Sequence, residues 1–174
     1  PLNMCVGILI AVMMNQKIRG IRILRTIYYL PNVVSIVAVS MLWYFIFQSN
    51  GVLNMLLGAV GIQGPNWLSD PAWAKNALIL MNCWNAGGSM VIYLAGLQGI
   101  PRSYYEAAEV DGAGALRKFF SITLPLLSPS IFYNLIIGII GALQTFSTAL
   151  VMTDGGPVNS TTFYVLTLYR RAFE

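Results

Sequence analysis

The sequence contains no histidine and very little charge. Only 9% of its 174 residues are Asp, Glu, Lys or Arg, whereas 57% are hydrophobic. A soluble domain carries about 25% charged residues, so this composition excludes an ordinary soluble domain and indicates a chain that lies in a bilayer. Cysteine is scarce as well, and Cys5 and Cys83 both fall in apolar segments. This pattern predicts neither a disulfide framework nor a metal site.

Charge is also missing from the complete apolar segments, where Lys75 at the edge of one segment is the exception. A transporter driven by protons or sodium usually has an ionisable residue inside the membrane. A membrane-embedded hydrolase needs acid–base or nucleophilic groups at its site. We therefore expect no catalytic residue in this chain and a source of energy outside it.

The ten basic residues occur in short clusters between the apolar segments, which is typical of topology signals beside membrane lipid rather than of a nucleic-acid-binding patch. Residues 15–26 contain no acid and hold Lys17, Arg19, Arg22 and Arg25. Residues 98–123 hold Arg102, Arg117 and Lys118. We expect both loops to be cytoplasmic. Residues 48–73, with Asp70 as their only charge, and residues 153–161, rich in Gly, Asn and Thr, are expected to be extracytoplasmic.

Four apolar segments can be placed between these loops. The first, residues 2–14, is shorter than the roughly 20 residues that cross a membrane, and its basic residues follow it, which is the wrong side for a signal peptide. The other three are predicted to be spans at residues 28–47, 74–97 and 130–151. Residues 162–173 are too short and too charged to span, so we expect an outer-surface helix there. We also expect the sequence to be a fragment that is incomplete at both ends.

Asp70 and Pro71 are a plausible helix N-cap and first helical residue for the third segment.

The predicted cytoplasmic loop at residues 98–123 carries the most specific pattern of the sequence. Glu106-Ala107-Ala108 is followed after three residues by Gly112, and after nine more by Ile122-Thr123-Leu124-Pro125.

Pro101 is predicted to open a short helix over Arg102 to Val110, and Gly112 to end it in the left-handed conformation that glycine adopts freely. Ala107 and Ala108 keep part of this helix thin, so that a partner can approach closely. Glu106, Glu109 and Asp111 would supply acceptors for the donors of that partner.

A second, amphipathic helix is predicted to follow. Its apolar side repeats at helical spacing, and its opposite side is polar, so that we expect it to lie along the inner membrane surface. The apolar side consists of Leu116, Phe119, Phe120 and Thr123, and the polar side of Arg117, Lys118 and Ser121. Pro125 and Pro129 are expected to break this helix before the fourth segment begins.

All seven positions of the loop pattern match the cytoplasmic signature of permease subunits of ATP-binding-cassette (ABC) importers. Nearly the whole chain resembles the binding-protein-dependent sugar permeases of the maltose and glycerol-phosphate type. The matching segments include Tyr29-Leu30-Pro31, Trp67-Leu68-Ser69-Asp70-Pro71, Leu94-Ala95-Gly96-Leu97-Gln98, Asp111-Gly112-Ala113 and Gly155-Gly156-Pro157. One departure is Val158, where glycine is common in the family.

The resemblance implies an all-α, multi-pass transmembrane helical bundle, the transmembrane domain of a type I ABC importer. Residues 1–174 would form one partial permease domain, with a cytoplasmic coupling loop at residues 99–125. Two permease subunits would form the pathway, two ATPase subunits would dock beneath them, and an extracytoplasmic solute-binding protein would deliver a sugar or related polyol. ATP and Mg²⁺ would be bound by the ATPase, with no cofactor in this chain. The implied coupling residues are Glu106, Ala107, Ala108, Asp111, Gly112, Leu124 and Pro125.

Uncharged polar groups in the spans are candidates for the solute pathway. Asn85 falls near the middle of the third segment, on one helical face with Trp84 and Gly88, and Gly141 and Thr145 share a face of the fourth. An amide beside an apolar ring suits a sugar, and the family places its sugar site on the spans that flank the loop. The same spacing is typical of close helix packing, and membrane tryptophans often serve as interfacial anchors.

Two other functions remain open from the sequence. One is an ABC permease for an amino acid, phosphate, peptide or other non-sugar solute. The second is a channel or structural subunit that uses no ATP. Uptake that persists without ATP, or without a binding protein, would favour the latter.

Overall fold

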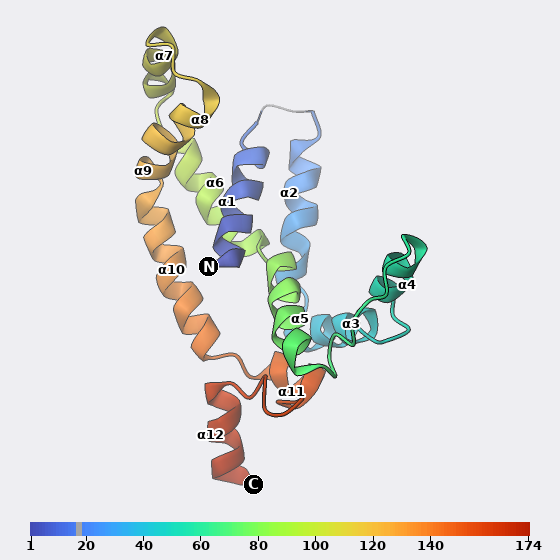
Figure 1. Ribbon diagram of the computed structural model, residues 1–174. Coiled ribbons are helices and arrows are strands. Elements are labelled where there is room, and N and C mark those ends of the chain that lie inside the picture. The colour runs from blue at the N-terminus through green and yellow to red at the C-terminus, as the bar shows by residue number, and fades with distance from the viewer. Residues whose placement is uncertain (17–18) are drawn as a thin grey trace. The chain divides into compact units, whose positions relative to one another are not determined.

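The computed structural model describes residues 1–16 and 19–174, and those residues form helices and loops without a strand (Figure 1). The predicted all-α class is therefore confirmed. Lys17, one of the predicted topology signals, lies outside the described residues. The backbone contacts divide the chain into two compact units. The first consists of Pro1–Leu30 and Asn85–Gly138, and the second of Pro31–Trp84 and Ile139–Glu174.

The first unit is built around the packing of α1 (Leu2–Met14) on α6 (Gly87–Gln98). Gly7 makes this close approach possible, because a Cβ atom there would lie 2.5 Å from the Ser89 hydroxyl oxygen. The buried side chains between these helices are apolar, with Met90 and Tyr93 fully enclosed. α2 (Ile21–Tyr29) joins the unit through Arg25, whose Nη2 donates to the Met14 carbonyl over 2.7 Å.

The rest of the first unit is the predicted cytoplasmic loop, residues 98–123, and the helix that follows it. These elements are α7 (Arg102–Val110), α8 (Ala115–Lys118), the π-helix η2 (Phe119–Thr123), α9 (Leu124–Leu126) and most of α10 (Ser128–Leu143). Leu127 is fully buried in the core of this unit, and Gly96 of α6 lets Leu127 and Ser130 approach. The loop is therefore anchored at its far end to the α1–α6 core.

The second unit packs α11 (Ser147–Thr153) against α3 (Ile36–Ile46) and α5 (Pro71–Trp84). Phe47 is its largest fully buried side chain, and Met81 and Met152 lie in the same cluster. The unit also contains α4 (Val52–Ala59), α12 (Tyr164–Phe173) and the last two residues of the short helix η1 (Leu30–Asn32). The predicted start of α5 is confirmed, since Asp70 Oδ1 accepts a hydrogen bond from the Ala72 N–H at 2.9 Å and Pro71 is the first helical residue.

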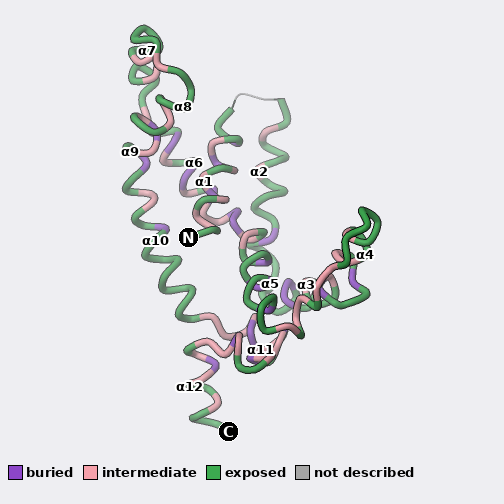
Figure 2. Tube along the Cα trace, viewed as in Figure 1, coloured by how far each residue is buried: buried purple, intermediate pink, exposed green. Residues whose placement is uncertain are grey.

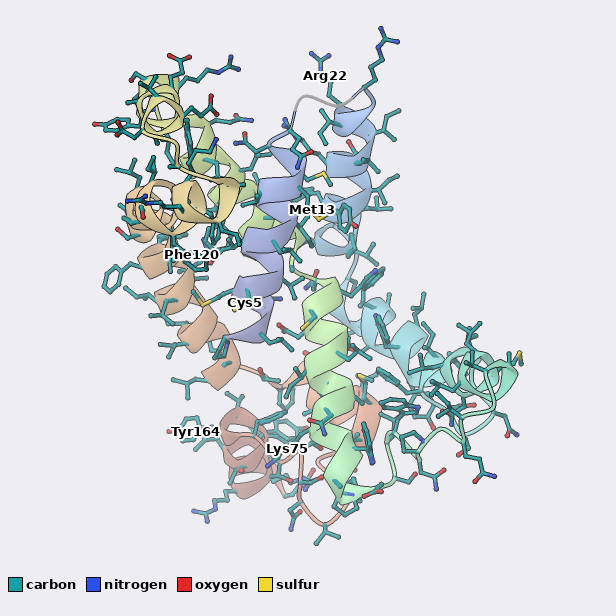
Figure 3. All side chains as sticks on the ribbon, turned by 45° about the horizontal axis from the view of Figure 1, so that its top comes forward. Cys5, Met13, Arg22, Lys75, Phe120 and Tyr164 are labelled. Atoms are coloured by element: carbon teal, nitrogen blue, oxygen red, sulfur yellow. The ribbon has the colours of Figure 1, made fainter. Side chains whose placement is uncertain are left out.

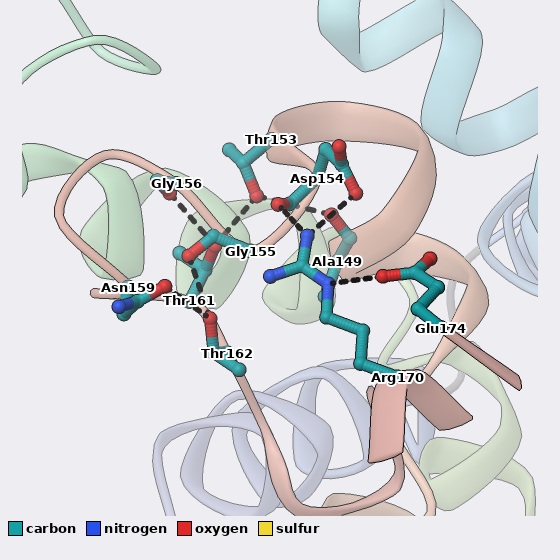
Figure 4. Close-up of polar contacts among 10 residues, drawn as sticks. All are labelled: Ala149, Thr153, Asp154, Gly155, Gly156, Asn159, Thr161, Thr162, Arg170 and Glu174. Carbon is teal, nitrogen blue, oxygen red and sulfur yellow. Dashed lines mark hydrogen bonds and ion pairs between the residues drawn. The ribbon is translucent and has the colours of Figure 1, made fainter. Parts of the chain in front are cut away.

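The segment between α11 and α12 is held by a polar network (Figure 4). Arg170 Nη2 donates to the carbonyl oxygen and to Oδ1 of Asp154, at 2.7 and 2.9 Å. Thr161 is fully buried, shares a 2.6 Å hydrogen bond with Thr153, and donates to the Gly156 carbonyl. The predicted helix over residues 162–173 is confirmed as α12, which begins two residues later than expected.

None of the three predicted spans is a single continuous helix, a feature that the sequence did not indicate. Residues 28–47 are interrupted after η1, residues 74–97 at Asn85–Ala86, and residues 130–151 between α10 and α11. No single described helix is long and apolar enough to cross a membrane by itself. Three pairs of neighbouring helices are long and apolar enough to cross a membrane when each pair is taken together. They lie at residues 21–46, 71–98 and 115–143.

Candidate functional site

The helix α7 has the bounds that Pro101 and Gly112 predict. Pro101 is extended, with φ −60° and ψ 137°, and the helix begins at the next residue. At the other end Gly112 takes φ +73°. The Gly112 N–H donates to the carbonyl oxygen of Glu109, and the Ala113 N–H donates to the carbonyl oxygen of Ala108. This pair of hydrogen bonds is a Schellman motif, which satisfies carbonyls that the helix end would leave free. The predicted left-handed glycine is confirmed.

No residue of α7 is buried, and the helix projects beyond the ends of α6 and α9 (Figures 1 and 2). Glu106 and Ala107 are exposed and Ala108 is half-buried, while Val110 leaves 88% of its surface exposed. The small side chains and free carboxylate of this exposed helix are therefore accessible to another protein. Glu106 forms no ion pair with any described residue.

Glu109 differs from Glu106 in this respect. Its Oε1 accepts a charge-assisted hydrogen bond from Lys118 Nζ at 2.7 Å. Lys118 therefore competes with a partner's donors for the carboxylate of Glu109, which was predicted to bind such donors. A second contact joins the same two segments, because the hydroxyl groups of Tyr105 and Thr123 share a hydrogen bond at 3.0 Å. Thr123 is buried, whereas Glu109 and Lys118 are partly solvated. The buried contact therefore determines how α7 sits on the next helix more than the ion pair does.

The prediction that Pro125 breaks the second helix is wrong. The helix runs from Ala115 to Leu126 because residues Phe119–Thr123 adopt a π-helical turn. Proline in a regular α-helix removes one hydrogen bond and clashes with the carbonyl four residues earlier. The wider π turn just before Pro125 relieves this conflict, and the actual break falls at Leu127, with Pro129 in the first turn of α10.

Of the predicted coupling residues, Glu106, Ala107, Ala108, Asp111 and Gly112 lie together on α7 and the turn that ends it, while Leu124 and Pro125 lie on α9. Asp111, Gly112 and Pro125 are exposed, and Leu124 is half-buried. On the intervening stretch Leu116 and Phe120 are 76% and 60% exposed, and Figure 3 labels Phe120. That exposure fits the prediction of an apolar side that faces lipid, which stays a prediction.

The candidates for the solute pathway are more dispersed. Asn85 lies at the break between α5 and α6, so the predicted continuous face through Trp84, Asn85 and Gly88 is interrupted. Asn85 Oδ1 is buried and has no hydrogen-bond partner among the described residues. Gly141 is exposed in α10, and Thr145, after its end, donates from its hydroxyl to the Gly141 carbonyl at 3.2 Å. The role of these five residues stays a prediction.

A chain of aromatic rings in the second unit was not predicted. Trp73, Trp67, Phe47, Trp43 and Trp84 follow one another with ring centroids 5.0 to 5.8 Å apart. Edge-to-face and tilted pairs at such distances are favourable aromatic contacts. The aromatic chain joins Trp67, in the loop before α5, to Trp84, one of the pathway candidates in this unit. The sequence shows that residues 43–84 contain many aromatic residues, but it does not show which rings contact one another.

The comparison with known protein families decides the identity of the chain. The model of the family described as "Binding-protein-dependent transport system inner membrane component" matches residues 3–173. The chain belongs to this family. The family resemblance and the prediction of a multi-pass protein of the inner membrane are thereby confirmed.

Two named permeases are similar in sequence to the whole of this chain. The probable ABC transporter permease protein YesP of Bacillus subtilis is 46% identical, and the lactose transport system permease protein LacF of Rhizobium radiobacter is 40% identical; each alignment covers 100% of this chain. The chain spans 58% and 60% of the length of these two relatives. Both relatives are named as permeases rather than as enzymes.

A solved structure gives the same result for the fold. The crystal structure of a bacterial ABC transporter involved in the import of the acidic polysaccharide alginate contains a chain that matches with a TM-score of 0.81 and 32% identity. The match covers 97% of this chain and 60% of that one. The predicted transmembrane fold of an ABC importer permease is therefore confirmed for the part of the family fold that this chain spans.

Proposed function

We propose that this chain is part of a permease subunit of an ATP-driven ABC importer, and that the importer carries a sugar or related polyol. The observation that carries the proposal is the geometry of α7. It is an exposed helix of nine residues with an unpaired Glu106, ended by a left-handed glycine. Such a helix can enter a cleft of a separate ATPase and transmit its movement.

In this mechanism the chain itself hydrolyses nothing. ATP and Mg²⁺ are bound by the ATPase subunits, and Glu106 accepts hydrogen bonds from donors in their cleft. Movement of α7 passes to η2 and α9 through Tyr105–Thr123 and Glu109–Lys118. From there it reaches α10 at Leu127, which is packed in the α1–α6 core. A second permease subunit completes the pathway, and alternating access follows from movement of the two subunits.

The assignment to sugars rests on the relatives. LacF is named for lactose transport, and another relative, 37% identical over 92% of this chain, is the trehalose/maltose transport system permease protein MalF of Thermococcus litoralis. The alginate transporter has been crystallised in complex with a periplasmic protein that binds an alginate pentasaccharide. By analogy, a solute-binding protein delivers the sugar to this permease from the extracytoplasmic side.

The test is uptake by the full-length protein, assembled with its ATPase and solute-binding protein in proteoliposomes. Labelled lactose, maltose, trehalose and glucose are offered beside an amino acid mixture, phosphate and a peptide. We expect saturable uptake of a sugar that requires both ATP and the binding protein. Uptake confined to the other solutes would replace the sugar assignment. Uptake that continues without ATP would replace the importer by a channel.

A further inference from the structure

A cavity of about 540 Å³ lies within the second unit, and none of the residues that line it is a predicted coupling or pathway residue. Three segments line it: the end of α3 with the turn that follows, the loop that precedes α5, and the end of α11. All three adjoin or lie in the loops that are predicted to be extracytoplasmic. The volume falls in the range of roughly 300–1,000 Å³ that is usual for small-molecule sites.

The lining combines aromatic rings with amides. Tyr44 and Trp67 contribute ring surface, Gln48 and Asn50 contribute amide groups, and the fully buried Phe47 is packed in the wall. Neither amide side chain has a hydrogen bond to a described residue, so both are available to a ligand. A carboxamide both donates and accepts, as sugar hydroxyls do, and an aromatic face suits the apolar C–H face of a sugar ring.

Two of the three segments that line the cavity are cross-linked by hydrogen bonds. Asn54 Nδ2 donates to the carbonyl oxygens of Ser49 and Pro65, and Asn54 Oδ1 accepts from Trp67 Nε1 at 2.8 Å. Ser49 also donates to the Asn66 side chain. These bonds hold the turn after α3 against the loop before α5, so a ligand would meet groups that are already in place.

The charge of the lining limits the kind of sugar. Among the described residues that line the cavity, Asp154 is the only charged one, and its carboxylate accepts a hydrogen bond from Arg170 over 2.9 Å. No lysine or arginine is among the described residues that line the cavity. A uronate or sulfonate would therefore find no unpaired cation in the lining, since Arg170 is paired with Asp154, whereas the hydroxyl groups of a neutral sugar can bond to the amides and to Asp154.

We infer that this cavity is an extracytoplasmic binding site for a neutral saccharide, occupied after release from the solute-binding protein and before passage through the membrane. The inference rests on the proposed sugar import and adds a site and a charge class to it. Phe47 and Trp67 stack at 5.7 Å in the lining and belong to the aromatic chain that ends at Trp84. The site thus adjoins the part of the pathway that the sequence predicts.

The first test is protection of an introduced cysteine in the full-length transporter. Asn50→Cys is placed in a background with Cys5→Ala and Cys83→Ala, and labelled with a membrane-impermeant maleimide in the presence of lactose, maltose, trehalose or glucose. We expect the transported sugar to slow labelling at least threefold. The control is Gln63→Cys. Gln63 is exposed and lies in the same predicted extracytoplasmic segment, residues 48–73, but outside the lining, so that no sugar should change its labelling rate.

A second measurement separates this site from a docking surface for the binding protein. Gln48→Ala should raise the KM for sugar uptake roughly threefold to tenfold, the effect of one lost hydrogen bond, with kcat unchanged. Gln63→Ala should leave the KM unchanged. If Gln48→Ala instead raises the binding-protein concentration needed for half-maximal ATPase activity, the surface docks that protein and the inference is wrong.

The remaining outcomes separate the inference from the proposed function. Wild-type sugar uptake without protection at Asn50→Cys and without a change in KM overturns the saccharide site alone. Wild-type uptake of acidic sugars only overturns the neutral charge class. Absence of any sugar uptake by the wild type overturns the proposed function together with the site.

Discussion

The hydroxyl oxygens of Tyr105 and Thr123 lie 3.0 Å apart and join α7 to the π-helix η2. Thr123 is buried beneath the loop, so this hydrogen bond links the exposed helix to the interior of its unit. Together with the Glu109–Lys118 pair it joins α7 to the next helix at two points, so that we expect the two to move as one body. In the proposed mechanism this body is the lever through which the ATPase acts.

Replacing Tyr105 by phenylalanine removes the hydroxyl and keeps the ring. A hydrogen bond of this kind contributes about 0.5–1.5 kcal/mol, so we expect the number of solute molecules moved per ATP to fall roughly twofold to tenfold. ATPase activity and uptake are measured together in proteoliposomes. The control is Tyr104→Phe, since Tyr104 is largely exposed and makes no hydrogen bond through its hydroxyl to a described residue. Equal coupling in both variants would show that the Tyr105 contact is not part of the lever.

Gly112→Ala tests the joint at the end of α7. Open space surrounds Gly112, so an added methyl group would meet no neighbour and the cost is in the backbone. A left-handed conformation costs an L-residue roughly 1–2 kcal/mol, and we expect reduced ATP-driven uptake. Gly114→Ala is the matched control, because Gly114 has φ −68° and the same open surroundings. Asparagine at position 112 tolerates positive φ and should restore part of the activity. Identical effects at positions 112 and 114 would contradict the account.

The sequence predicts both ends of α7 closely but does not predict the breaks within the spans, and the reason is physical. Pro101 and Gly112 restrict the backbone at single positions, so they fix both ends of the helix. Inside the apolar segments hydropathy is uniform and does not mark a break. Gly87 and Gly88 follow the break at Asn85–Ala86, and glycine lowers helix stability by about 1 kcal/mol, yet this local signal is weak against a long apolar run.

The candidate site shows the same division. The exposed position of Glu106 follows from local pattern, whereas the hydrogen bond between Tyr105 and Thr123 joins residues 18 positions apart and depends on the π turn. The conflict between Pro125 and a regular helix could have indicated that turn. The cavity near Trp67 depends on contacts between three separate segments, which one sequence cannot pair.

Asn54→Ala should destabilise the second unit. The substitution removes three hydrogen bonds and leaves Trp67 Nε1 and the Ser49 and Pro65 carbonyls without this partner. We expect a loss of roughly 1–3 kcal/mol, seen as a lower midpoint of thermal unfolding in detergent and a change in tryptophan fluorescence. Asn76→Ala loses only a bond to its own helix, at Ala72, and is the control. A midpoint equal to that of Asn76→Ala would show that the cross-link contributes nothing.

Val158→Gly should stabilise the protein. Val158 has φ +50° and is 87% exposed, so its side chain packs little while its backbone is in a region that β-branched residues avoid. This geometry also explains why glycine is common at the position in the family that the sequence resembles. We expect a gain of about 1 kcal/mol in the free energy of unfolding. A lower melting midpoint for Val158→Gly than for wild type would contradict this interpretation.

The central claim is that Glu106 on α7 contacts an ATPase, and co-purification tests it most directly. The full-length protein is purified from native membranes in mild detergent as wild type, Glu106→Lys and Ser121→Lys, the last adding the same side chain at an exposed position of the same loop outside α7. We predict that an ABC ATPase accompanies the wild type and Ser121→Lys and is lost or uncoupled in Glu106→Lys. An ATPase absent from all three samples, or equally bound and coupled in all three, would contradict the account.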